Sequence, residues 1–190
     1  MLIPLDDIRA ARDRAAGIVK VTPLDLSATF SGLCRRQIYL KLENLQKTGS
    51  FKVRGALNKI QLMDPAARAH GVITASAGNH AQGVALAARK RGIPAVIVMP
   101  QTTPAIKVKA VLDLGAEALL RGDIYDAAYD HALTLARERH LVFVHPFDDP
   151  DVIAGQGTIG MEVLRQSAGQ VDAIFVPIGG GGLISGIGAS

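Results

Sequence analysis

The second part of the chain alternates between short apolar runs and longer helical stretches, and this alternation constrains the fold more than any other feature. Strands joined by helices of about 10–15 residues form parallel sheets through right-handed crossovers. The predicted fold class is therefore α/β, a parallel sheet with helices on both faces. We expect strands at residues 72–75, 95–99, 117–120, 141–144 and 173–177, and helices at 79–91, 104–114, 124–139 and 151–166, the last starting late because of Gly155 and Gly157.

The N-terminal part of the chain has a less regular pattern. We expect an amphipathic helix at residues 5–19, a second helical piece at 25–33 and a strand at 37–42. A further helix should open in the next segment and run to about Met63, with Ser50 as its N-cap.

Residues 48–56, TGSFKVRGA, place Lys52 at the start of that helix between apolar neighbours. A lysine amine is nucleophilic only without its proton, and a helix N-terminus and an apolar setting both lower its pKa. These conditions are typical of lysines that form Schiff bases with carbonyl compounds. The alternative for any single lysine is a surface side chain whose ammonium group stays in water.

Four consecutive glycines lie between the last predicted strand and the start of an apolar helix. Backbone N–H groups of such a loop can converge on a phosphate, whose charge the helix N-terminus favours. The spacing does not fit the dinucleotide-binding pattern of three glycines, and no Gly-Lys-Ser/Thr follows as in a P-loop. A flexible linker is the alternative, but a strand-to-helix setting without serine or proline argues against it. The predicted phosphate-binding residues are Gly179, Gly180, Gly181, Gly182 and Leu183.

A second candidate loop follows the strand predicted at residues 72–75. In open parallel sheets, ligands bind at the carboxyl ends of the strands, and backbone N–H groups at such a loop suit a carboxylate. The alternative is an ordinary helix cap made by the serine. The five histidines show no metal-binding spacing, so no metal site is predicted. The predicted carboxylate loop consists of Ser76, Ala77, Gly78, Asn79 and His80.

A reactive lysine, a phosphate loop and a carboxylate loop together indicate pyridoxal phosphate acting on an amino acid. Four motifs carry a closer resemblance: KLENLQKTGSFKVRGA at 41–56, SAGNHAQG at 76–83, AGQGT at 154–158 and PIGGGGL at 177–183. With these motifs in this order, the chain resembles the threonine/serine dehydratases (threonine ammonia-lyases), above all the catabolic type. These are fold type II pyridoxal phosphate enzymes with a tryptophan synthase β-like architecture of parallel sheets.

The resemblance implies a role for each motif. Lys52 would hold pyridoxal 5'-phosphate as a Schiff base and exchange the Cα proton, and Phe51 would pack beside the cofactor. Asn79 would bond its 3′-oxygen, the glycine run would hold its phosphate, and residues 76–80 would bind the substrate carboxylate. The implied reaction converts L-threonine or L-serine to 2-oxobutanoate or pyruvate and ammonia, in amino-acid catabolism or isoleucine biosynthesis.

The residue at position 77 separates the alternatives within this family. Serine racemases carry a serine there, which acts as acid and base on the second face of Cα, whereas Ala77 cannot transfer a proton. Cysteine-synthase-like relatives usually have threonine in place of His80. Elimination is therefore favoured, while a serine racemase-like or other β-elimination enzyme on the same fold stays an alternative.

The resemblance also divides the chain. Residues 1–68 would begin the large cofactor domain, residues 69–147 would form the small α/β domain, and residues 148–190 would return to the large one. The chain would then be the N-terminal portion of a longer enzyme, truncated before the group that bonds the pyridine nitrogen. A catalytically inactive fragment that only binds phosphate compounds is a further alternative.

Charge and composition restrict the partners. The net charge of +4 comes from scattered residues, so we expect a small amino-acid substrate and no nucleic acid. No membrane span or signal sequence is predicted, which favours a cytoplasmic enzyme, and the open apolar surface of a partial sheet favours a homo-oligomer. Cys34, the only cysteine, is expected to be a small buried side chain.

Overall fold

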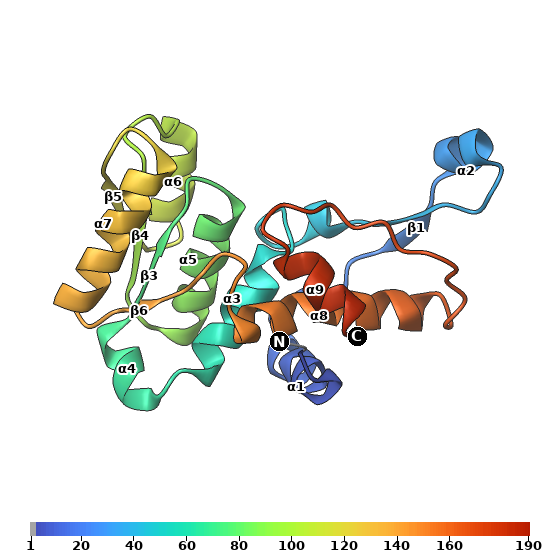
Figure 1. Ribbon diagram of the computed structural model, residues 1–190, viewed down its shortest axis with the longest axis horizontal. Coiled ribbons are helices and arrows are strands. Elements are labelled where there is room, and N and C mark those ends of the chain that lie inside the picture. Colours follow the sequence, from blue (N-terminus) through green and yellow to red (C-terminus); the bar gives the residue numbers. More distant parts are fainter. Residues whose placement is uncertain (1–2) are drawn as a thin grey trace.

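A computed structural model describes residues 3–190, and a four-stranded parallel sheet lies at one end of it (Figure 1). The strand order is β5-β4-β3-β6, and all neighbouring pairs are parallel. The α/β class with a parallel sheet is therefore confirmed. The strands are β3 (Val72–Ala75), β4 (Ala95–Met99), β5 (Glu117–Leu120) and β6 (Val142–Phe143).

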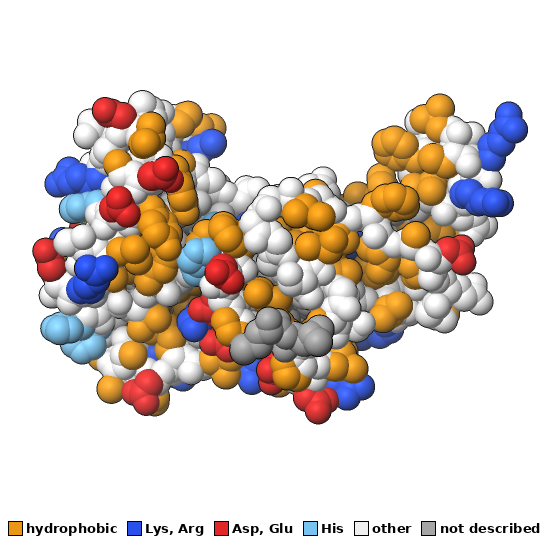
Figure 2. Space-filling view, viewed as in Figure 1, with side chains coloured by type: hydrophobic (Ala, Val, Ile, Leu, Met, Phe, Trp, Pro, Cys, Tyr) orange, Lys and Arg blue, Asp and Glu red, His pale blue; other side chains and the backbone are white. Residues whose placement is uncertain are grey.

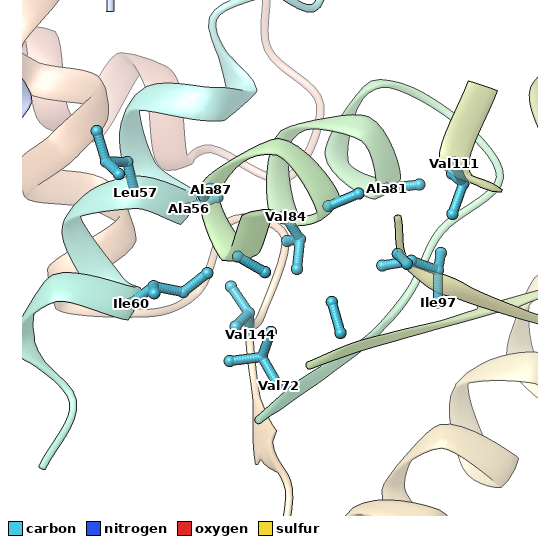
Figure 3. Close-up of a cluster of buried hydrophobic side chains, with 14 of the residues drawn as sticks. Ala56, Leu57, Ile60, Val72, Ala81, Val84, Ala87, Ile97, Val111 and Val144 are labelled. Atoms are coloured by element: carbon cyan, nitrogen blue, oxygen red, sulfur yellow. The ribbon is translucent and has the colours of Figure 1, made fainter. Parts of the chain in front are cut away.

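Helices cover both faces of this sheet, because alternate side chains of its strands point to opposite sides. Val72 and Ile97 face α5 (Asn79–Arg91) and α6 (Ala105–Leu112), in the cluster that Figure 3 shows. On the other face, strand residues such as Ile73 and Val98 pack against α7 (Tyr125–Glu138). Because helices cover both faces, every residue of β3 and β4 is buried, and apolar residues dominate both strands without alternating with exposed polar ones.

A layer of helices lies beside the sheet unit, and α3 (Lys52–Leu62) joins the two, since it packs on both α5 and α8 (Pro150–Gln166) (Figure 1). Glycine allows α3 and α8 to approach closely, because a Cβ added to Gly155 of α8 would lie 2.6 Å from the carbonyl oxygen of Arg54. Helices α1 (Leu5–Ala15) and α9 (Gly182–Gly188) pack on α8, and α4 (Pro65–His70) follows α3. Among residues 3–190, no helix is both long and apolar enough to cross a membrane.

Residues 24–45 form an arm that projects from the helical layer (Figure 1). Strands β1 (Leu24–Leu26) and β2 (Tyr39–Lys41) pair antiparallel, α2 (Ala28–Cys34) lies at the tip, and a short 3-10 helix (Glu43–Leu45) follows. Figure 2 shows apolar side chains gathered over this arm, and Phe30 and Leu33 are among the exposed ones. Cys34 is exposed as well, so its predicted burial is wrong.

Four other predictions about secondary structure need correction. The helix predicted at 25–33 begins only at Ala28, because Ser27 caps it and the preceding residues pair with β2. Residues 173–177 form no strand: no segment among residues 3–190 pairs with them, and Phe175 is 93% exposed. Helix α8 starts at Pro150, where the Asp149 side chain caps it, and not late. Ser50 is not the N-cap of α3; Phe51 occupies that position.

Candidate functional site

Lys52 is the first residue of α3, and its half-buried side chain points to the loop that follows β6. Its amine donates a hydrogen bond of 2.7 Å to the carbonyl oxygen of Pro146 and lies 5.3 Å from the ring centre of Phe51. Burial lowers the pKa of the Lys52 amine, because few polar groups compensate the lost hydration of the ammonium form. Helix α5 approaches closely here: a Cβ on Gly83 would lie 3.0 Å from the Lys52 carbonyl carbon.

The residues after β6, Val144 to Phe147, bring the three predicted motifs together. The Val144 carbonyl accepts from His80 Nε2 at 3.0 Å, and the buried Pro146 carbonyl accepts from Lys52. The Phe147 ring packs against the glycine run. This convergence follows from topology: β3 and β6 are parallel neighbours, so the loops after them lie at the same edge of the sheet.

The glycine run tolerates no side chain at the two positions that face Phe147. A Cβ on Gly180 would overlap the Phe147 ring, and one on Gly182 would lie 2.6 Å from the Phe147 carbonyl oxygen. Gly181 adopts a φ of 88°, a conformation that side chains disfavour, while Gly179 is exposed. The loop therefore presents backbone alone before the first turn of α9, where Leu183 is half-buried.

The loop predicted to bind a carboxylate lies between β3 and α5. Ser76 Oγ accepts from the Gly78 amide at 3.2 Å, so the serine orders the loop, and Gly78 is the N-cap of α5. Ala77 is half-buried and Asn79 is exposed, so the backbone and the Asn79 amide stay accessible to a ligand.

His80 differs from its neighbours in the loop, because its ring is buried. Burial, opposed by the hydrogen bond to Val144 and reinforced by Lys52 and His145, lowers the pKa of His80 to about 4. The ring is therefore neutral near pH 7. With Nε2 as donor, its buried Nδ1 is an acceptor that has no hydrogen-bond partner in the described part of the chain.

Sequence reasoning missed the buried ion pairs around Arg54, whose side chain is 1% exposed. Its guanidinium binds Glu43 and Glu162 at 2.7 Å each, and Lys41 pairs with Glu162 at 2.6 Å. These bonds tie the segment before Lys52 to α3 and α8. Only the presence of charged residues within apolar helices could have signalled them, since the partners lie as many as 121 residues apart.

Sequence reasoning also missed the residues of the loop after β6, among them Pro146 and Phe147. No pattern in the sequence marks a backbone carbonyl as the partner of Lys52. The Phe147 ring would have been assigned to packing, which is its role here.

Comparisons with known proteins agree with this geometry. The family described as "Pyridoxal-phosphate dependent enzyme" matches residues 16–190. The L-threonine ammonia-lyase of Thermotoga maritima is 52% identical over 186 residues, which cover 98% of this chain and 46% of that protein. The processed form of threonine deaminase isoform 2 from Solanum lycopersicum matches with a TM-score of 0.88 at 46% identity, over 96% of this chain and 50% of that one. Maize serine racemase matches with a TM-score of 0.95 at 39% identity, over 100% of this chain and 57% of that one.

The chain therefore belongs to the pyridoxal-phosphate dependent enzymes, and pyridoxal phosphate is its cofactor. It spans about half the length of the relatives it matches. The residues around the Val144–Phe147 loop fit this cofactor chemically. They combine a desolvated lysine amine, a side-chain-free backbone loop for a phosphate and an unpartnered acceptor on the buried His80.

Proposed function

We propose that the protein acts as a threonine ammonia-lyase, which converts L-threonine, and L-serine, to 2-oxobutanoate or pyruvate and ammonia. The observation that carries this proposal is the shared loop: Lys52, His80 and the glycine run all contact residues Val144 to Phe147. The curated relatives named L-threonine ammonia-lyase and L-threonine dehydratase support the choice of substrate.

We assign cofactor binding to one set of residues in this site. Lys52 holds the cofactor aldehyde carbon, Phe51 packs beside the ring, and Asn79 bonds the 3′-oxygen. Pyridoxal phosphate, once bound, supplies an electron sink for charge that develops on the substrate Cα. The phosphate contacts fall to the backbone N–H groups of Gly179, Gly180, Gly181, Gly182 and Leu183, where the start of α9 adds positive potential.

Lys52 also moves the proton. Its amine, with a pKa lowered by burial, would take the proton from the substrate Cα. The β-hydroxyl would leave as water together with the proton taken from Cα, and hydrolysis of the dehydrated product would yield the keto acid and ammonia. The half-buried position of Lys52 on a helix packed against α5 and α8 holds the amine in place for this transfer.

The substrate carboxylate is assigned to the loop of Ser76, Ala77, Gly78, Asn79 and His80. Backbone N–H groups supply the contacts, since the neutral His80 ring brings no positive charge. Ala77 places no proton donor on the second face of Cα, which favours elimination over racemisation. Serine racemase is thus a structural neighbour whose reaction differs from the one proposed here.

We further propose the domain roles inferred from the sequence. Residues 69–147 contain the whole parallel sheet and form the small domain, while residues 1–68 and 148–190 contribute to the large cofactor domain. Exposed apolar residues on the arm support association into a homo-oligomer, and a cytoplasmic location suits the proposed substrates.

Keto-acid release from L-threonine in the presence of pyridoxal phosphate tests the proposal. The wild-type protein and Lys47→Ala, which removes an exposed lysine of the same segment, should both release 2-oxobutanoate. Lys52→Ala should release at least a hundredfold less, because it lacks both the anchor and the base. Equal rates for the two lysine variants, or no keto acid from the wild type, would contradict the proposal.

A further inference from the structure

The turn that carries Pro146 and Phe147 is held by the imidazole of His145. His145 Nδ1 accepts hydrogen bonds from the backbone amide of Asp148 at 2.7 Å and from that of Phe147 at 3.3 Å. A ring nitrogen accepts only with a lone pair, so these two bonds require a neutral imidazole with its proton on Nε2. If Nδ1 took up a proton, it would become a donor that faces two N–H donors, and both hydrogen bonds would be lost.

The same turn supplies two of the contacts that build the site. The Pro146 carbonyl accepts from the Lys52 amine, the Phe147 ring fills the space beside Gly180, and the Phe147 carbonyl oxygen lies beside Gly182. The His145 ring meets the Phe147 ring edge-on, with 4.7 Å between centroids and 83° between planes. His145 therefore supports both the lysine side and the glycine side of the site through this turn.

We propose that His145 is a positioning residue for the reaction: its neutral ring holds the 145–148 turn against Lys52 and the glycine run, and its protonation releases that turn. The catalytic part of this inference rests on the proposed function. The structural part concerns residues of this chain alone.

The groups around His145 favour the neutral ring. Tyr129 of α7 and Phe143 contribute apolar ring surface, with centroids 6.3 and 6.2 Å away. Lys52 from α3 and His80 from α5 are the other basic groups that face it. Burial lowers the pKa of His145, Lys52 lowers it further, and the carboxylates of Asp148 and Asp149 oppose this shift.

Two variants separate the hydrogen bonds of His145 from its ring. His145→Asn keeps an acceptor, because an asparagine Oδ1 accepts from the amide two residues on, but it cannot titrate. His145→Phe keeps the ring contact with Phe147 and loses the acceptor. His140→Asn is the matched control, since His140 is exposed and asparagine tolerates its positive φ of 56°.

Amide exchange across pH is the first measurement, because it requires neither cofactor nor activity. The ¹⁵N chemical shift of Nδ1 reports the pH at which His145 takes up its proton. Through that titration, the protection factors of the Phe147 and Asp148 amides should fall about five- to tenfold in the wild type and in His140→Asn. Protection in His145→Asn should be independent of pH. His145→Phe should lack protection at every pH.

Activity on L-threonine is the second measurement. The acid limb of kcat should share its midpoint with the His145 titration in the wild type, and His145→Asn should flatten that limb. Unchanged protection through the titration, or wild-type protection in His145→Phe, would overturn the proposal. If no keto acid forms in any protein, the proposed function fails, while the exchange data still decide the role of His145.

Discussion

The buried, neutral His80 predicts that the protein loses stability as the pH falls from neutral toward 4. Its pKa is about 4 in the folded chain, because burial disfavours the imidazolium, against an ordinary value of 6.5. The unfolded chain therefore takes up the proton first. Stability is complete above about pH 6.5, declines as the pH falls to about 4, and levels off below that value.

The size of this effect follows from the separation of the two pKa values. At about 1.4 kcal/mol per pH unit, the interval between 6.5 and about 4 corresponds to roughly 3 kcal/mol. This is a large share of the ~5–15 kcal/mol that stabilises a typical domain.

Urea unfolding from pH 7.5 to 4 measures the effect, with His80→Gln as the comparison. A glutamine can donate to the Val144 carbonyl and does not titrate. The free energy of unfolding of the variant should therefore fall less than that of the wild type over this pH range, by a difference of roughly 3 kcal/mol. His145, whose pKa burial also lowers, is present in both proteins, so its contribution cancels in the difference. Equal pH dependence in the two proteins, or an NMR-measured pKa near 6.5 for His80, would refute the reasoning.

Three further predictions test other parts of the structure. Arg54→Met removes the guanidinium that Glu43 and Glu162 share, leaves Lys41 as the cation on Glu162, and should lower the free energy of unfolding by about 3–5 kcal/mol, measured by urea unfolding. Gly155→Ala should lower the free energy of unfolding by more than about 2 kcal/mol, because its Cβ would lie 2.6 Å from a backbone oxygen. The control Gly32→Ala in α2 places a Cβ with no atom within 4 Å and should change the free energy of unfolding by less than about 1 kcal/mol. Ala77→Ser should raise the ratio of serine racemisation to keto-acid release, measured by chiral chromatography; an unchanged ratio would contradict the assigned role of Ala77.

The sheet could be predicted almost residue by residue, because its signals are local. The apolar runs of β3, β4 and β5 are bounded by glycine, proline or polar residues, and both of their faces are covered by helices from the same part of the chain. The strand predicted at 173–177 has a similar apolar run, but a strand also needs a hydrogen-bonded partner. No other segment among residues 3–190 pairs with it.

The elements of the site could be predicted as separate motifs, but not their common contact. Position at the carboxyl edge of a sheet identified residues 76–80, and a run of glycines identified residues 179–182. The meeting point, Val144 to Phe147, depends on the order of strands, and local patterns do not encode which strand lies beside β3. The Arg54 ion pairs were missed for the same reason, since they join segments distant in sequence.

Mapping of covalently attached pyridoxal phosphate tests the central claim, that Lys52 is the cofactor lysine, most directly. The protein is incubated with one equivalent of pyridoxal phosphate near pH 7, reduced with borohydride and digested, and the label is located by mass spectrometry. The lowered pKa of Lys52 and the adjacent glycine loop predict that most of the label lies on Lys52. A label spread over exposed lysines such as Lys47, with Lys52 unmodified, would contradict the account.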